Sequence, residues 1–190
     1  MNAIDTVGQI DETCFRIEYD IARKLAMERR NLHVEAKNGT ERWNSDQYKA
    51  DTTGVAGELA FAKFSGLEVD LGLYVDGDKG TDFKFIHNSK ECVIDVKSFE
   101  QRVPGAKHNF KLYVAAHEIK RPTNVYVLAK VAFPNVWLLG WETKFTILNS
   151  PTVQLNYLNY TIPQNLLRPM DALLRGIQKS KNENHLLHTV

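Results

Sequence analysis

Two aspartates and one lysine are the residues of this chain whose types and spacing most directly suggest chemistry. Asp82 follows Gly80-Thr81, and the triplet Asp95-Val96-Lys97 stands further along the chain. Carboxylate oxygens are preferred ligands of hard divalent cations such as Mg²⁺, which keep several waters when bound. An ammonium group near such a cation suits a metal-bound water or a phosphate. These residues therefore predict a divalent-cation site, provided that the fold brings the two aspartates together.

A β-hairpin is the element expected to position them. Residues 81–86 and 91–98 both alternate between apolar and polar side chains, as strands do. The segment His87-Asn88-Ser89-Lys90 suits a four-residue connection between them. If Ile86 pairs with Glu91, the register of the whole hairpin follows, because side chains alternate strictly between the two faces of a sheet.

This register places the candidate residues on one face of the sheet. Asp82 lies directly opposite Asp95, and Lys97 points to the same face one pleat along the strand. Two carboxylates opposite one another repel, so the strand pair gains nothing from them. A divalent cation between them would turn the repulsion into binding, which makes Asp82 and Asp95 the expected ligands.

A helix predicted over residues 53–65 adds a third carboxylate. The segment is apolar nearly all round, and Glu58 falls on a largely apolar face at helical spacing. An unpaired carboxylate is costly there, so Glu58 is expected to have a strong partner. Two partners are open: a lysine or arginine of the core, or a metal ion shared with Asp82 and Asp95. Gly57 beside it would let the helix approach the sheet closely.

This ordered set of residues resembles the PD-(D/E)XK nuclease superfamily, which has the restriction-endonuclease-like fold. The first acid of the family motif matches Asp82, which Thr81 precedes in place of proline, and the (D/E)-x-K triplet matches Asp95-Val96-Lys97. Many members carry a glutamate on an upstream helix, and Glu58 matches it. The resemblance covers about residues 50–142. It implies an α/β fold with a central mixed β-sheet flanked by helices, and with N-terminal and C-terminal helical extensions.

In that superfamily the reaction is metal-assisted hydrolysis of a DNA phosphodiester bond. The resemblance implies Mg²⁺ as cofactor, with Mn²⁺ able to replace it, no other small-molecule cofactor, and DNA as partner. The implied metal ligands are Asp82, Asp95, the backbone carbonyl of Val96, and Glu58 directly or through a water. Lys97 would orient or help to deprotonate the attacking water, or neutralise the transition state. The implied catalytic residues are therefore Glu58, Asp82, Asp95 and Lys97.

Residues beyond the lysine are candidates for holding the DNA backbone. Ser98 and Gln101 follow it closely, and the segment 99–111 is basic, with Arg102 and Lys107 among its residues. A basic segment just past a catalytic strand is well placed for phosphate contacts. An exposed loop explains the same composition equally well.

Length and composition suit one globular domain with a core. The chain has 190 residues, of which 43% are hydrophobic and 25% charged, and a net charge of +1. The low charge argues against a simple DNA-coating protein, whereas a nuclease needs positive charge along one groove only. Cys14 and Cys92 lack metal-site spacing and are expected to be reduced thiols of a cytoplasmic protein. The chain contains no signal peptide and no apolar run of about 18 residues, so no membrane partner is expected.

Hydrophobic periodicity predicts the remaining elements. Apolar residues recur at helical spacing in an N-terminal helix over 11–31 and a C-terminal helix over 164–180. Residues 36–53 are polar and are expected to be loop. Strands are expected over 67–75, 125–133 and 136–141, and a short helix over 112–120.

Other functions are compatible with the same residues. One is a non-catalytic nucleic-acid-binding or regulatory protein on the same scaffold, and another is a structural protein whose D-x-K triplet is coincidental. In the second case Glu58 should be exposed or ion-paired, and the two aspartates should lie far apart. Among nucleases, restriction-type cleavage, junction resolution and end or flap trimming are open, and the first two usually need a symmetric homodimer.

Overall fold

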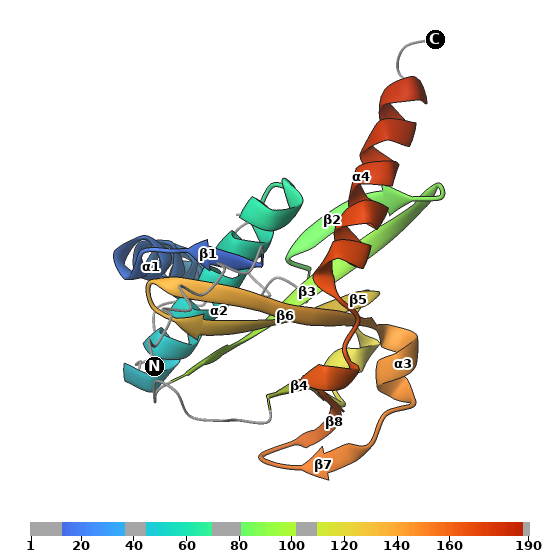
Figure 1. The fold of residues 1–190 in the computed structure, drawn as a ribbon. Coiled ribbons are helices and arrows are strands. Elements are labelled where there is room, and N and C mark those ends of the chain that lie inside the picture. The colour runs from blue at the N-terminus through green and yellow to red at the C-terminus, as the bar shows by residue number, and fades with distance from the viewer. Residues whose placement is uncertain (1–12, 37–44, 70–80, 102–109, 188–190) are drawn as a thin grey trace, which may run out of the picture.

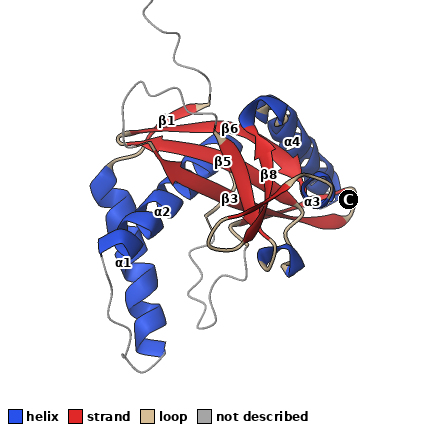
Figure 2. Ribbon diagram, turned by 90° about the horizontal axis from the view of Figure 1, so that it is seen from below, coloured by secondary structure: helices blue, strands red, loops and turns tan. Residues whose placement is uncertain are grey.

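A five-stranded mixed sheet forms the centre of the protein (Figures 1 and 2). The computed structural model describes residues 13–36, 45–69, 81–101 and 110–187. β3 and β5 run parallel, and the other neighbouring pairs among the described strands of this sheet are antiparallel. In spatial order the strands are β1 (Cys14–Arg16), β6 (Asn135–Thr143), β5 (Val125–Ala132), β3 (Lys90–Glu100) and β2 (Phe83–His87).

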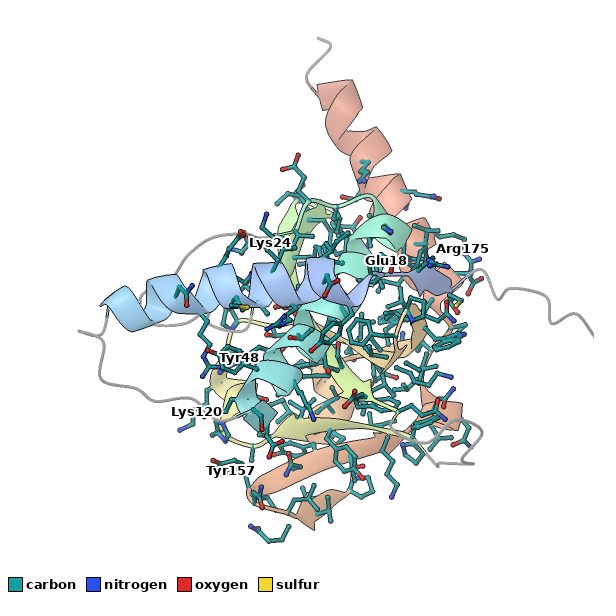
Figure 3. The ribbon with its side chains drawn as sticks, turned by 90° about the vertical axis from the view of Figure 1, so that its left-hand side faces the viewer. Glu18, Lys24, Tyr48, Lys120, Tyr157 and Arg175 are labelled. Carbon is teal, nitrogen blue, oxygen red and sulfur yellow. The ribbon has the colours of Figure 1, made fainter. Side chains whose placement is uncertain are left out.

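Helices form a layer on one face of this sheet. They are α1 (Tyr19–Ala36), α2 (Ser45–Ser65) and α4 (Met170–Leu187). α2 packs directly on the sheet, where the rings of Phe61 and Phe83 have centroids 4.8 Å apart. α1 crosses the outer side of α2 (Figure 3), so α2 is covered on two sides. This position explains why α2 is apolar nearly all round from Thr53 onward. None of the helices in the described ranges is long and apolar enough to span a membrane.

A second sheet, of three strands, covers part of the opposite face (Figure 1). In spatial order its strands are β4 (Lys111–Ala115), β8 (Leu158–Pro163) and β7 (Thr152–Gln154). Leu112, Val114 and Ile162 of this sheet are buried with Tyr126 and Leu128 of β5 in a second apolar core. The short helices η1 (Glu118–Lys120), α3 (Lys144–Leu148) and η2 (Gln164–Leu166) complete this side. The protein is therefore a mixed α/β protein with the large sheet between a helical layer and a small sheet.

The hairpin register expected from the sequence is confirmed. Ile86 pairs with Glu91, and the pairing continues along β2 and β3. His87 also pairs with Lys90, so the connection is a two-residue turn, Asn88-Ser89, with φ angles of 49° and 60°. Two residues with positive φ give a hairpin turn whose twist matches that of the strands. The two strands expected between residues 125 and 141 are also present, as β5 and β6.

The N-terminal helix begins later than its periodicity predicts. α1 starts at Tyr19, and the preceding residues form β1, which pairs with β6. Phe15 of β1 packs edge-on against Phe64 of α2, with ring centroids 6.2 Å apart. The apolar residues of segment 11–18 have helical spacing, but these tertiary contacts outweigh that local preference.

Four further expectations need correction. The predicted loop over 36–53 is wrong for residues 45–53, which belong to α2; the first of these side chains are exposed, so no apolar period marks the helix there. The predicted helix over 112–120 is instead β4 followed by η1, since a short apolar run does not distinguish the two. The C-terminal helix begins at Met170 and not near residue 164. Of the strand expected over 67–75, residues 67–69 are not in a strand and the others lie outside the described residues.

Cys92 of β3 should react slowly with thiol reagents. Burial raises the pKa of its thiol from 9.0 to about 11, which lowers the thiolate fraction near neutral pH about 100-fold. We expect the alkylation rate of Cys92 to rise steeply only as the pH approaches 11. Iodoacetamide labelling of a Cys14→Ser variant, followed by mass spectrometry across a pH series, measures this rate. The same variant unfolded in urea is the control, and equal rates in both states near neutral pH would contradict the prediction.

Candidate functional site

β3 turns two of the candidate residues toward the small sheet. Its residues alternate, so that Ile94 and Val96 join the core under the helices while Asp95 and Lys97 point to the other face. Parallel pairing sets Asp95 beside Tyr126 of β5 and Lys97 beside Leu128 of β5. Both Tyr126 and Leu128 lie in the core under the small sheet. Asp95 is almost completely buried, with 4% of its surface exposed.

Asp82 directly precedes β2, whose pairing with β3 ends at Phe83 opposite Ile94. Its backbone N–H donates to the carbonyl of Ile94 at 3.0 Å. Its carboxylate Oδ2 accepts a hydrogen bond from the backbone N–H of Val96 at 2.6 Å. The Asp82 side chain thus lies against the backbone of Val96, the middle residue of the Asp95-Val96-Lys97 triplet. The expected register is thus confirmed as far as Phe83 and Ile94, and the direct opposition of Asp82 and Asp95 stays a prediction.

Lys97 is held between two carboxylates. Its Nζ lies 2.9 Å from Asp95 Oδ2 and 3.2 Å from Glu118 Oε2. Burial lowers the pKa of the Lys97 ammonium, but the attraction of Asp95 and Glu118 outweighs it, so the pKa is raised overall. Lys97 is therefore a firmly protonated cation at neutral pH.

Glu118 is the functional candidate that sequence reasoning missed. It stands in η1, and besides Lys97 it binds Arg121, whose Nη1 lies 3.1 Å from Glu118 Oε1. No local motif marks Glu118, and it falls within the segment predicted to be helical. Only the crossover from β3 to the parallel strand β5 brings η1 to Lys97.

A row of polar side chains continues across the large sheet from the two aspartates. Asp95 neighbours Tyr126, and Tyr126 neighbours Glu142 of β6. Burial, and then the charge of Asp95, raise the pKa of the Tyr126 phenol, so the phenol stays neutral near neutral pH. Glu142 is buried and pairs with Arg168, whose Nε lies 3.0 Å from Glu142 Oε1. The buried row therefore carries charge that the protein itself neutralises.

Glu58 belongs to the helical layer and pairs with an arginine. Its Oε2 lies 2.6 Å from Nη1 of Arg29, which comes from α1. Of the two partners that the sequence leaves open, the structure thus contains the core arginine. Among the described residues, no three His, Cys, Asp or Glu side chains gather in a group that could hold a metal ion, so Glu58 is not grouped with Asp82 and Asp95.

Replacing Glu58 tests whether it is the ion-pair partner of Arg29 or a metal ligand. We expect Glu58→Gln to lower the free energy of unfolding by about 1.5 kcal/mol, because it leaves the half-buried Arg29 guanidinium without its charged partner. Binding of Mg²⁺ measured by calorimetry should be unchanged. Asp171→Asn is the matched control, since its pair with Arg175 is largely exposed and should contribute under about 0.5 kcal/mol. Loss of Mg²⁺ binding in Glu58→Gln would instead identify Glu58 as a metal ligand.

Of the four residues expected to contact DNA, the structure describes two, Ser98 and Gln101. Ser98 points to the helical layer, where its buried hydroxyl has no hydrogen-bond partner among the described residues. The backbone N–H of Gln101 donates to the carbonyl of Val131 at 2.8 Å, at the end of β3. Arg102 and Lys107 lie outside the described residues.

The oxygen donors of Asp82 and Asp95 fit a magnesium ion. Mg²⁺ is commonly bound by one or two carboxylates while it keeps several of its waters. Asp95 points to the face of β3 away from the helices, and Asp82 lies against Val96 of the same strand. A two-carboxylate site therefore requires no rearrangement of the helical layer, whereas recruiting Glu58 requires it to leave Arg29.

No protein-family model, no curated protein and no solved structure matches this chain.

Proposed function

We propose that this protein is a metal-dependent deoxyribonuclease that hydrolyses DNA phosphodiester bonds at Asp82, Asp95 and Lys97. The observation that carries the proposal is the set of contacts around the triplet: Asp82 Oδ2 accepts a hydrogen bond from the Val96 N–H at 2.6 Å, and the Lys97 ammonium lies 2.9 Å from Asp95. A mixed sheet with helices on its face also agrees with the expected restriction-endonuclease-like fold. Restriction-type cleavage, junction resolution and flap trimming stay open within this proposal, as does a homodimer.

Asp82 and Asp95, with the backbone carbonyl of Val96, would hold the metal in this proposal. Mg²⁺, or Mn²⁺ in its place, supplies a bound water of lowered pKa and stabilises charge on the phosphoryl oxygens. Glu58 keeps a structural role through Arg29 and is left out of the ligand set.

Lys97 would stabilise negative charge on the phosphate. A firmly protonated ammonium is poorly suited to removing a proton from water, so of the roles open to Lys97 the electrostatic one is favoured. Glu118 would position this ammonium by a second ion pair, and Arg121 would in turn hold Glu118.

DNA cleavage with a matched pair of variants tests the proposal. Supercoiled plasmid and a branched DNA are incubated with wild type in Mg²⁺, Mn²⁺ or EDTA. We expect metal-dependent cutting that Asp95→Asn reduces about 100-fold or more, since a metal ligand is lost while the shape is kept. Lys84→Ala, an exposed lysine of the same hairpin, should cut like wild type. No cutting of either DNA, together with no metal-dependent shift in melting temperature, would overturn the proposal.

A non-catalytic nucleic-acid-binding or regulatory protein is the second candidate. The observation that favours it is that buried carboxylates at and around the site have cationic partners in the protein: Asp95 with Lys97, Glu142 with Arg168, and Glu58 with Arg29. Charges neutralised in this way need no metal. Under this alternative Mg²⁺ leaves the melting temperature unchanged in wild type and in Asp95→Asn alike.

A further inference from the structure

Aromatic rings and one lysine form a continuous stack on the large sheet. Phe99 of β3 pairs with Lys130 of β5, and Lys130 pairs with Trp137 of β6, so the three side chains form a row on one face. Phe110, just before β4, stacks on Phe99 with ring centroids 4.6 Å apart and an interplanar angle of 29°. These four residues, all half-buried, are called the aromatic row.

The ammonium of Lys130 lies between aromatic rings. Its Nζ is 3.8 Å from the centroid of the Trp137 ring and 5.9 Å from that of Phe110. Within the described ranges no carboxylate pairs with Lys130, whereas Lys97, Arg29 and Arg168 each pair with at least one. A cation held over rings and not neutralised by the protein is complementary to an anionic ligand.

The aromatic row lies on the same face as the candidate site. Asp95, Lys97 and Phe99 are successive residues on one side of β3, so Phe99 stands roughly 7 Å beyond Lys97 along the strand. Trp137 lies near the start of β6, at the end of this strand away from α3, and the small sheet lies beneath the end near α3 (Figure 1). A strand of nucleic acid with a phosphate at Lys97 would therefore reach the row within about one nucleotide.

We propose that the aromatic row binds an unpaired stretch of DNA next to the phosphodiester at the candidate site. Bases would stack on the half-buried rings, and the Lys130 ammonium would pair with a backbone phosphate. Aromatic side chains interleaved with a cation suit single strands, because every base offers a ring face and every nucleotide a charge. The position beside a scissile bond rests on the proposed function, but binding to the row needs neither metal nor cleavage.

Binding of single-stranded DNA in EDTA tests the row without any reaction. The affinity of a fluorescein-labelled oligonucleotide is measured by anisotropy for wild type, Lys130→Ala and Trp137→Leu. We expect each variant to bind roughly 10-fold more weakly, through the lost phosphate contact and the lost stacking respectively. Lys84→Ala is the control, since it removes an exposed lysine of the same sheet that has its own partner, Glu91. Circular dichroism and the melting temperature show whether each variant is folded.

Two competing ligands separate stacking from charge alone. Wild type should bind the oligonucleotide more tightly than an abasic strand of equal length and more tightly than the matching duplex. Equal affinity for the abasic strand or the duplex, or wild-type affinity of Lys130→Ala, would overturn this inference. Single-strand binding that depends on the row, in a protein that cuts no DNA, supports the row and refutes the nuclease. Metal-dependent cutting, together with wild-type affinity of both Lys130→Ala and Trp137→Leu for the oligonucleotide, supports the nuclease and refutes the row.

Discussion

Replacing Lys97 with alanine is expected to lower the free energy of unfolding by about 3 kcal/mol and to abolish cleavage. The substitution removes the cation that lies between Asp95 and Glu118. Their side chains are only 6% and 19% exposed, so solvent cannot replace the ammonium fully. Removing one partner of a buried ion pair leaves an uncompensated charge, which is among the costliest single changes in a protein.

A double variant separates the charge effect from lost packing. Urea unfolding at neutral pH is measured for Lys97→Ala, Asp95→Asn and the two together. We expect the double variant to be more stable than Lys97→Ala, because asparagine removes the buried charge that has lost Lys97 while it keeps the shape. Strict additivity of the two single effects would contradict the ion-pair account.

The same ion pair sets a pH dependence. The pKa of Lys97 in the folded protein is raised above its ordinary value of 10.5, so its stabilising effect is complete below that value. It is lost only as the pH rises through the higher folded pKa. The difference in unfolding free energy between wild type and Lys97→Ala should therefore stay constant near neutral pH and shrink in strongly alkaline solution.

Gly57→Ala is the second change with a large expected effect, a loss of about 3 kcal/mol in unfolding free energy. A Cβ at this position would lie 1.9 Å from Ser98 Oγ and 3.2 Å from both Ser98 Cβ and Ala129 Cβ. The Ser98 side chain or α2 would have to shift, and overpacking of a core costs more than the helix propensity of alanine returns. This close approach confirms the packing role that the sequence suggests for Gly57.

Gly54→Ala is a matched control for this prediction. It lies in the same helix, and a Cβ there would meet nothing within 4 Å. We expect it to stabilise the protein by about 0.5 kcal/mol or more, because alanine loses less backbone entropy in a helix than glycine does. Adding Ser98→Ala should relieve part of the cost of Gly57→Ala. Thermal unfolding of Gly57→Ala, Gly54→Ala and the Gly57→Ala/Ser98→Ala double variant measures these effects. Equal effects of the two glycine substitutions would show that α2 does not touch the sheet at Gly57.

Local patterns in the sequence are sufficient for the hairpin and for much of the sheet. Strict alternation and a short turn set the register of β2 and β3, so the pairing from Phe83 with Ile94 to His87 with Lys90 follows from local sequence alone. The apolar surroundings of Glu58 likewise show that it needs a strong partner. The sequence does not indicate β7, β8 and α3, because short elements with mixed composition carry little periodicity.

The identity of the charged partners is decided only by the tertiary structure. Arg29 reaches Glu58 because α1 crosses α2, and Glu118 reaches Lys97 because the chain crosses over between two parallel strands. Such contacts join residues that are far apart along the chain, and no local sequence pattern indicates that they meet. The alternation of a strand shows which side chains share a face, but what covers that face depends on how remote elements pack. For this reason the candidate residues can be identified from the sequence, whereas the ion pairs that hold Lys97 and Glu58 in place cannot.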